Sequence, residues 1–239
     1  METIIDFDTV SYTWPGGKGL QDVRLAVSGG DFVLVSGPSG SGKSTLLRLA
    51  ARLEEPDSGT VRFAGVPLAD LDPPKLRRRI GYIQQTPVVM EGSVRENLLL
   101  PYSFAVNREE VPPSDTVLQD WLNRVALARV GLDDVAAALS VGQKQRLCII
   151  RSLLLRPELL LMDEPTSALD RESRHIVEQL TEELNREGMT IILVSHSDYR
   201  PQVAHVCVTV KDGRVAGGDG RVAQGEGRMA MNDASAEVV

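Results

Sequence analysis

The segment Phe32–Leu53 constrains the fold of this chain more than any other part of its sequence. It opens with Phe32–Ser36, a short apolar run containing two valines, which predicts a buried parallel strand. Residues Ser44–Leu53 follow a helical pattern. Between them lies Gly37-Pro38-Ser39-Gly40-Ser41-Gly42-Lys43-Ser44-Thr45, which fits the pattern G-x-x-x-x-G-K-[ST]. A strand, a glycine-rich loop and a helix in this order predict an α/β fold.

The loop between the strand and the helix suits a phosphate group. Its glycines let the backbone wrap round an anion with N–H groups pointing inward, and the helix start adds partial positive charge. We therefore predict a nucleoside triphosphate site, in which Lys43 reaches the β- and γ-phosphates and the Ser44 hydroxyl is a ligand of Mg²⁺. An ordinary glycine-rich turn is the alternative, and the combination of strand, loop, Lys-Ser pair and helix argues against it.

Composition excludes several classes of protein. Of the 239 residues, 42% are hydrophobic and 25% are charged, as in a soluble globular protein. The net charge of -7 argues against a nucleic-acid-binding surface. The most apolar stretch, Leu147–Met162, is interrupted by charged residues, and the N-terminus lacks a signal peptide's basic start and apolar core. Cys148 and Cys207 each lie in an apolar run, so we expect buried free thiols in a reducing cytoplasm.

Strands and helices alternate along most of the chain. Expected strands are Ile4–Phe7, Val23–Val27, Thr60–Phe63, Leu159–Met162 and Thr190–Val194, and an amphipathic helix is expected over Ser173–Glu187. Continuous apolar strands alternating with helices predict a parallel sheet covered on both faces. The stretch from about 86 to 150 predicts an inserted helical subdomain. Residues 217–239 are rich in Gly, Ala, Asp and Glu, and we expect a disordered tail there, after a domain over 1–216.

Two acids directly follow the apolar strand Leu159–Met162. Because ligands of open α/β sheets bind beyond the carboxyl ends of the strands, Asp163 is predicted to be the second protein ligand of the Mg²⁺ held by Ser44. Glu164 is predicted to polarise a water for attack on the γ-phosphate. A solvated acidic turn is the alternative, which the four apolar residues before the acids disfavour.

His196 follows the apolar strand Thr190–Val194 in a similar way. A lone histidine is often a structural residue, but here the strand pattern suggests the same sheet edge. We therefore predict that its ring N–H donates to a γ-phosphate oxygen or to the attacking water.

A second helix start with anion-binding character lies at Ser140-Val141-Gly142-Gln143. A chain with one triphosphate loop has no obvious need for a second. One explanation is a head-to-tail pair of subunits, in which each Ser140 end closes over the nucleotide of the other subunit. A simple helix cap is the alternative, and the position just before the acidic strand favours the pair.

Together these residues resemble the ATP-binding subunits of ABC transporters, over about Thr3 to Arg214. Gly37–Thr45 matches Walker A and Leu159–Asp163 matches Walker B, with Glu164 at the position of the family's catalytic base. The resemblance implies a P-loop NTPase with a parallel core sheet, an N-terminal antiparallel β-subdomain and an inserted α-helical subdomain. It also implies ATP and Mg²⁺ as ligands, an ATP-dependent homodimer and an integral membrane permease subunit as partner.

The same resemblance assigns the remaining site residues. Ser140–Gln143 is similar to the family signature and His196 to its switch histidine. Asp170, in Ser167-Ala168-Leu169-Asp170, is similar to the D-loop aspartate. Gln85 is preferred over Gln84 as the Q-loop glutamine, which touches Mg²⁺ and water beside the surface that meets the membrane subunit. Trp14 matches the aromatic residue that stacks on adenine, in preference to Tyr12.

Val141 departs from the family pattern, which usually has glycine there. Its branched Cβ restricts the backbone and narrows the approach to phosphate. Because the Ser140 hydroxyl and the Gly142 N–H are retained, we expect ATP turnover with altered closure of the dimer.

Three sequence features resemble the Fet-type ATP-binding subunits, a group associated with iron or metal export. They are Gln85-Thr86-Pro87, the run Ser93–Pro101 and Ile150-Arg151-Ser152. The sequence has no Cys/His cluster with metal-ligand spacing to bind such a cargo.

Other functions remain open from the sequence. An importer subunit for a small solute such as phosphate or an amino acid is one alternative, and a non-transport ABC ATPase is another. A small-molecule kinase shares the phosphate loop but explains neither Ser140–Gln143 nor His196. We expect a cytoplasmic protein, peripheral on the inner face of the cell membrane.

Overall fold

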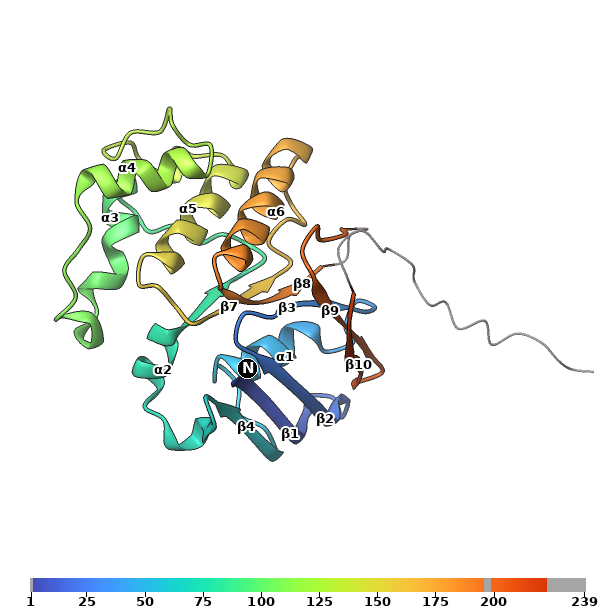
Figure 1. Cartoon of the computed structure of the whole chain (residues 1–239). Helices are drawn as coiled ribbons and strands as arrows, with labels where there is room; N and C mark the ends of the chain where they lie inside the picture. Colours follow the sequence, from blue (N-terminus) through green and yellow to red (C-terminus); the bar gives the residue numbers. More distant parts are fainter. Residues whose placement is uncertain (1, 196–198, 223–239) are drawn as a thin grey trace, which may run out of the picture.

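A six-stranded sheet crosses the middle of the molecule and divides it into two layers (Figure 1). The computed structural model describes residues 2–195 and 199–222. The sheet has the order β10-β9-β3-β8-β7-β6, in which β10 is antiparallel to β9 and the other neighbours are parallel. Its strands are β3 (Phe32–Ser36), β6 (Ile80–Ile83), β7 (Leu159–Asp163), β8 (Thr190–Val194), β9 (His205–Lys211) and β10 (Arg214–Val222).

In the central strands β3, β8 and β7, the two faces of this sheet bury alternate residues. In β7, Leu159 and Leu161 belong to one hydrophobic core, whereas Leu160 and Met162 belong to the other. All five residues of β7 are buried. A strand that is covered on both faces needs apolar residues at every position, which is why these strands read as continuous apolar runs. The α/β fold with a parallel core sheet is thus confirmed.

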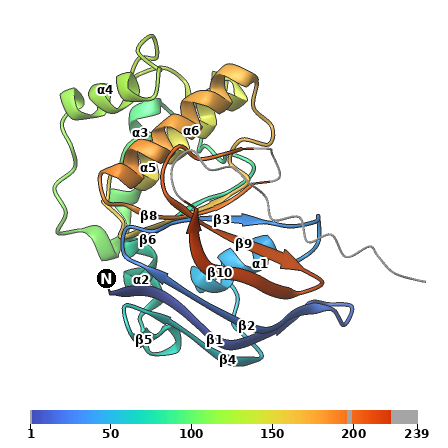
Figure 2. The same ribbon diagram turned by 45° about the vertical axis from the view of Figure 1, so that its right-hand side comes forward.

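The layer below the sheet contains α1 (Lys43–Ala50) and a four-stranded sheet of order β2-β1-β4-β5. Its neighbouring strands are antiparallel, as the resemblance implies. Figures 1 and 2 both show this sheet wrapping the side of α1. The four strands are β1 (Thr3–Thr13), β2 (Gly19–Ser28), β4 (Ser58–Phe63) and β5 (Val66–Pro67).

The layer above the sheet is helical and includes the predicted insertion. Two of its helices begin with capping boxes, at Ser93 with Glu96 and at Ser140 with Gln143, so the sequence itself fixes where they start. Its α-helices are α3 (Val94–Leu99), α4 (Asp115–Arg124), α5 (Val141–Leu153) and α6 (Arg171–Arg186). Helix α2 (Pro73–Arg79), which leads into β6, instead buries Leu76 in the core of the lower layer. The 3₁₀ helices among the described residues are η1 (Leu68–Asp70), η2 (Leu100–Ser103), η3 (Ala105–Asn107) and η4 (Ala136–Ala138).

Two expectations need correction. Strand β10 continues to Val222, six residues past the predicted domain boundary at 216, because it pairs with β9 through Arg221 and Val222. The expected disorder of 217–239 is therefore wrong for 217–222, and 223–239 lie outside the described residues. Cys148 is a buried free thiol as expected, but Cys207 is exposed because it points outward from an alternating strand.

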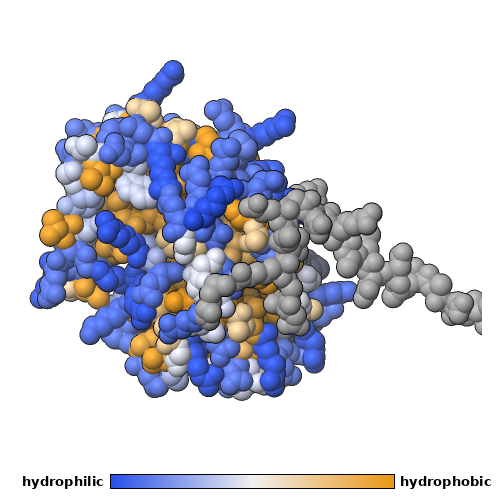
Figure 3. Space-filling view, viewed as in Figure 1, coloured by the Kyte–Doolittle hydropathy of each residue, from blue (hydrophilic) through white to orange (hydrophobic). Residues whose placement is uncertain are grey.

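The surface facing the viewer in Figure 3 is largely hydrophilic, with small scattered apolar patches. No helix in the described part of the chain is long and apolar enough to cross a membrane.

Candidate active site

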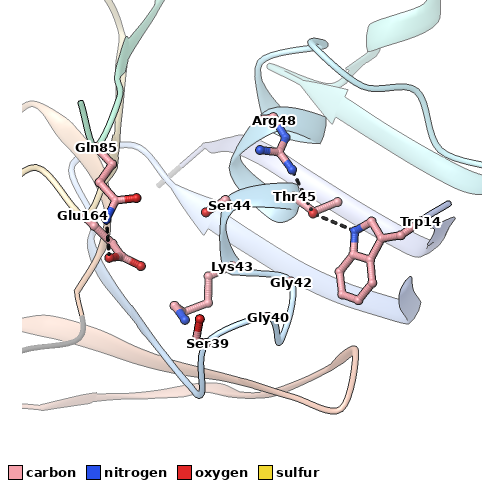
Figure 4. Close-up of a pocket in the computed structure, with 10 residues that line it drawn as sticks. All are labelled: Trp14, Ser39, Gly40, Gly42, Lys43, Ser44, Thr45, Arg48, Gln85 and Glu164. Carbon is pink, nitrogen blue, oxygen red and sulfur yellow. Dashed lines mark hydrogen bonds between the residues drawn. The ribbon is translucent and has the colours of Figure 1, made fainter. Parts of the chain in front are cut away.

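The glycine-rich loop lies between β3 and α1 and forms one wall of a pocket of about 690 Å³ (Figure 4). The Lys43 ammonium donates hydrogen bonds to the carbonyl oxygens of Gly37 and Pro38, at 2.9 Å each. Burial lowers the pKa of Lys43, and the charges of Glu164 and Asp163 partly oppose that effect. The loop thus holds a cation at its centre, where an anionic ligand would lie. The pocket is lined by Trp14, Ser39, Gly40, Gly42, Lys43, Ser44, Thr45, Arg48, Gln85 and Glu164.

Two glycines of the loop are required by space as well as by conformation. Gly37 has a φ of 142°, and a Cβ there would lie 2.0 Å from the carbonyl oxygen of Val210. Gly42 has a φ of 115°, and its Cβ would lie 2.5 Å from Leu20. Gly37 therefore packs against the backbone of β9 and Gly42 against a side chain of β2, so a larger residue at either position would require a shift.

Ser44 and Asp163, which the sequence predicts as metal ligands, meet directly. The Ser44 hydroxyl donates to Oδ1 of Asp163 at 2.9 Å, and Asp163 is 8% exposed. A hydroxyl and a buried carboxylate beside a phosphate loop form the hard-oxygen donor set that Mg²⁺ prefers. The residues present therefore fit this ion.

Tyr82 is a member of the site that the sequence reasoning missed. Its hydroxyl donates to Oδ2 of Asp163 at 3.3 Å, because parallel pairing of β6 with β7 places Tyr82 opposite Leu161. Burial and the negative charge of Asp163 raise the pKa of Tyr82, so its hydroxyl remains a protonated donor at neutral pH. Both oxygens of Asp163 are consequently oriented by hydrogen bonds.

Glu164 lies at the end of β7 with a φ of 49°, the left-handed region that favours glycine. Its backbone N–H donates to the carbonyl oxygen of Val194 at 3.1 Å, which holds this conformation. The Gln85 amide donates to Oε2 of Glu164 at 3.3 Å and to the Ser167 hydroxyl at 3.2 Å. The structure thus brings the predicted base and the predicted Q-loop glutamine together. His196 lies outside the described residues.

Trp14 lies at the opposite end of the pocket from Gln85 and Glu164 (Figure 4). Its indole N–H donates to the Thr45 hydroxyl at 2.9 Å. Tyr12, the less favoured candidate, instead donates its hydroxyl to Glu54 and does not line the pocket. Arg48 also lines the pocket, although no motif pointed to it.

The residues Ser140, Gly142 and Gln143 are not among the described residues that line this pocket. Ser140 instead caps α5, where its hydroxyl accepts the N–H of Gln143 at 3.2 Å while Gln143 Oε1 accepts the N–H of Ser140 at 2.9 Å. Asp170 caps α6 by accepting the Ser173 N–H at 2.8 Å, which lowers the pKa of that carboxyl. Within the described part of one chain, the predicted signature thus lies outside the pocket that the phosphate loop lines.

The sequence profile of the ABC transporter family matches residues 20–167, a stretch that runs from β2 through the phosphate loop to four residues past the end of β7. The chain belongs to the ABC transporter family. The "Probable iron export ATP-binding protein FetA" of Escherichia coli is 37% identical over 81% of this chain and 84% of that protein. The "Glutamine transport ATP-binding protein GlnQ" of the same organism is 36% identical over 89% of this chain and 90% of that protein.

Solved structures of this family share the fold. CbiO1 of Clostridium perfringens, described as part of the ABC transporter complex CbiONQ, superposes with a TM-score of 0.75 at 28% identity, over 90% of this chain and 88% of that chain. A dimeric ATP-binding cassette in a post-hydrolysis state, bound to ADP and Pi, has a TM-score of 0.75 at 28% identity, over 91% of this chain and all of that chain. This chain is thus an ATP-binding subunit of the ABC transporter type, with the fold of an ABC ATPase.

Proposed function

We propose that this chain hydrolyses ATP as half of a head-to-tail homodimer and thereby drives a separate integral membrane permease. The single observation that carries the dimer is the separation of the pocket residues from the Ser140 end of α5 within the described part of one chain. A second copy would supply Ser140, Gly142 and Gln143 to the open side of the pocket. The dimeric ADP- and Pi-bound relative is in accord with this arrangement.

In the proposed site, Lys43 binds the β- and γ-phosphates while backbone N–H groups of the loop surround them. Ser44, Asp163 and Gln85 would hold Mg²⁺, which would neutralise phosphate charge. Glu164 orients a water and accepts its proton as the water oxygen bonds to the γ-phosphorus and the bond to the β-phosphate oxygen breaks. ADP and Pi are the products. His196 is proposed to donate to the γ-phosphate or the water.

Binding and hydrolysis would drive opposite movements of the dimer. ATP closes it because the nucleotide contacts both copies only in the closed state. Loss of the γ-phosphate contacts then lets it reopen. Asp170, which caps α6 beside the signature helix, is proposed to lie at the interface between copies.

The charge of Glu164 is the feature to test first. A positioned general base contributes about 10²–10⁴-fold to a rate, so Glu164→Gln should lower phosphate release by roughly that factor. ATP should still drive dimerisation, measured by size-exclusion chromatography with light scattering. Glu109→Gln, an exposed acid distant in sequence from the site, is the matched control and should behave like the unmodified chain. A monomeric Glu164→Gln protein with full turnover would refute both roles.

The membrane partner has support on the surface near Gln85. Val88 and Met90, which follow Gln85 closely in sequence, are 55% and 53% exposed. Exposed apolar side chains close to a nucleotide site suit a protein partner that responds to ATP. We propose that this surface binds the permease on the inner face of the membrane. Copurification and mass spectrometry of the partner from membranes test this directly.

The cargo that we propose is iron or another metal, moved outward, because of the likeness to FetA. Import of a small solute is the second candidate, favoured by a comparable likeness to GlnQ. Vesicles containing this chain with its copurified permease distinguish the two. ATP-dependent movement of Fe²⁺ away from the side of the ATPase supports export, and uptake of an amino acid toward that side supports import.

A further inference from the structure

The hydroxyl of Thr45 accepts two hydrogen bonds from separate parts of the chain. The indole Nε1 of Trp14 donates to it at 2.9 Å, and Nη2 of Arg48 donates to it at 3.3 Å (Figure 4). Thr45 follows Ser44 in the first turn of α1, lines the nucleotide pocket and is only 3% exposed. Its hydroxyl is therefore held from two sides.

A threonine hydroxyl has one proton to donate and two positions that accept. Indole N–H and guanidinium N–H groups donate and never accept, so neither contact can reverse. With both accepting positions filled, the remaining capacity of the Thr45 hydroxyl is its own proton. A group with only a proton to offer suits a ligand atom that only accepts, and phosphate oxygens are such atoms.

Arg48 also forms a long ion pair on the side away from Thr45. It lies three residues after Thr45, on the same face of α1. Its Nε lies 3.8 Å from Oε1 of Glu54, and the Tyr12 hydroxyl donates to Oε2 of the same carboxylate at 2.8 Å. A chain of polar contacts thus runs from β1 through Glu54 and Arg48 to Thr45.

We propose that Trp14 and Arg48 are positioning residues that fix the Thr45 hydroxyl as a donor to a phosphate oxygen of the nucleotide. Trp14 then acts through its indole N–H as well as through its ring face. This inference rests on the proposed nucleotide site. It predicts that a phenyl ring at position 14, which could still stack, is an incomplete replacement.

A double-mutant cycle with ADP as the probe tests this, since ADP avoids turnover. Trp14→Phe keeps an aromatic ring and removes the N–H, whereas Thr45→Val keeps the shape and removes the hydroxyl. Affinity is measured by calorimetry for each single variant and for the double variant. One hydrogen bond is worth a change of about 2- to 13-fold in affinity. In the chain that keeps the Thr45 hydroxyl, Trp14→Phe should therefore weaken ADP binding by this factor in addition to any effect of the altered ring. In the Thr45→Val background, only the smaller effect of the altered ring should remain.

An equal effect of Trp14→Phe in both backgrounds would overturn the inference, because Trp14 would then act through its ring alone. Arg48→Met, which keeps the aliphatic stem, provides a second cycle with Thr45→Val and should show the same dependence. Trp121→Phe, at the only other tryptophan of the chain, is the control and should leave ADP affinity unchanged. Failure of the unmodified chain to bind ADP would instead refute the proposed nucleotide site itself.

Discussion

Substitution of Gly142 by alanine should destabilise the chain by an amount that its contacts define. A Cβ at Gly142 would lie 2.5 Å from Oγ and 3.0 Å from Cβ of Ser173, at the start of α6. Ser173 is 6% exposed, and its backbone N–H is bonded to Asp170, so it has little room to move. Overpacking of this kind costs about 1–3 kcal/mol, and the higher helix propensity of alanine offsets up to about 1 kcal/mol. We expect a net loss of about 1–2 kcal/mol.

For a chain of this length, such a loss lowers the melting temperature by about 2–8 °C. Thermal unfolding followed by circular dichroism measures it. Val141→Ala is the neighbouring control, since Val141 is 50% exposed, and it should change stability by less than about 0.5 kcal/mol. Adding Ser173→Ala to Gly142→Ala removes the 2.5 Å contact and should recover part of the loss. Unchanged stability of Gly142→Ala, or no recovery in the double variant, would refute the reasoning.

Three further predictions concern the site and its surroundings. Tyr82→Phe removes one hydrogen bond to Asp163, so the Mg²⁺ concentration for half-maximal ATPase activity should rise about tenfold; an unchanged requirement would contradict a role for Tyr82 at the metal. Val141→Gly should raise ATP turnover by widening the approach to phosphate, and a fall in turnover would count against that view. The Asp170 carboxyl, whose pKa is lowered by its hydrogen bonds, stabilises the fold above its usual pKa of 3.8, and this contribution is lost as the pH falls through the lowered value. Asp170→Asn retains an acceptor that does not titrate, so the stability advantage of the unmodified chain over this variant should shrink in acid; a difference independent of pH would contradict the assignment.

The sequence predicts best where a strand is buried on both faces. Phe32–Ser36 and Thr190–Val194 have the predicted bounds because all of their apolar residues pack in one of the two cores. Helix α2 was not predicted, because Pro73–Arg79 buries only Leu76 and ends in three arginines, which leaves no apolar periodicity. Strand β9 lies near the edge of the sheet, next to β10, and one of its faces is exposed. Its sequence therefore lacks the continuous apolar run that marks the strands buried on both faces.

Within the site, contacts between residues that belong to recognisable motifs were predictable, as for Ser44 with Asp163, whereas contacts of residues outside the motifs were not. The loop from Gly37 to Thr45 has a fixed spacing of glycine, lysine and serine, so its phosphate-binding role could be proposed from the motif alone. The contact of Tyr82 with Asp163 depends on β6 lying next to β7, although 81 residues separate the two side chains. Arg48 likewise reaches the pocket only because α1 turns that face toward it.

The left-handed backbone conformation of Glu164 lowers folding stability at the same position where we propose the catalytic base. A non-glycine residue with this conformation costs about 1 kcal/mol or more, and glycine there would be free of the penalty. Selection for thermal stability alone should therefore favour glycine at this position and remove the carboxylate that we propose as the base. An engineered thermostable variant of this chain should be screened for turnover from the first round, because one of the described positions where glycine would relieve a positive φ is the residue that we propose as the base.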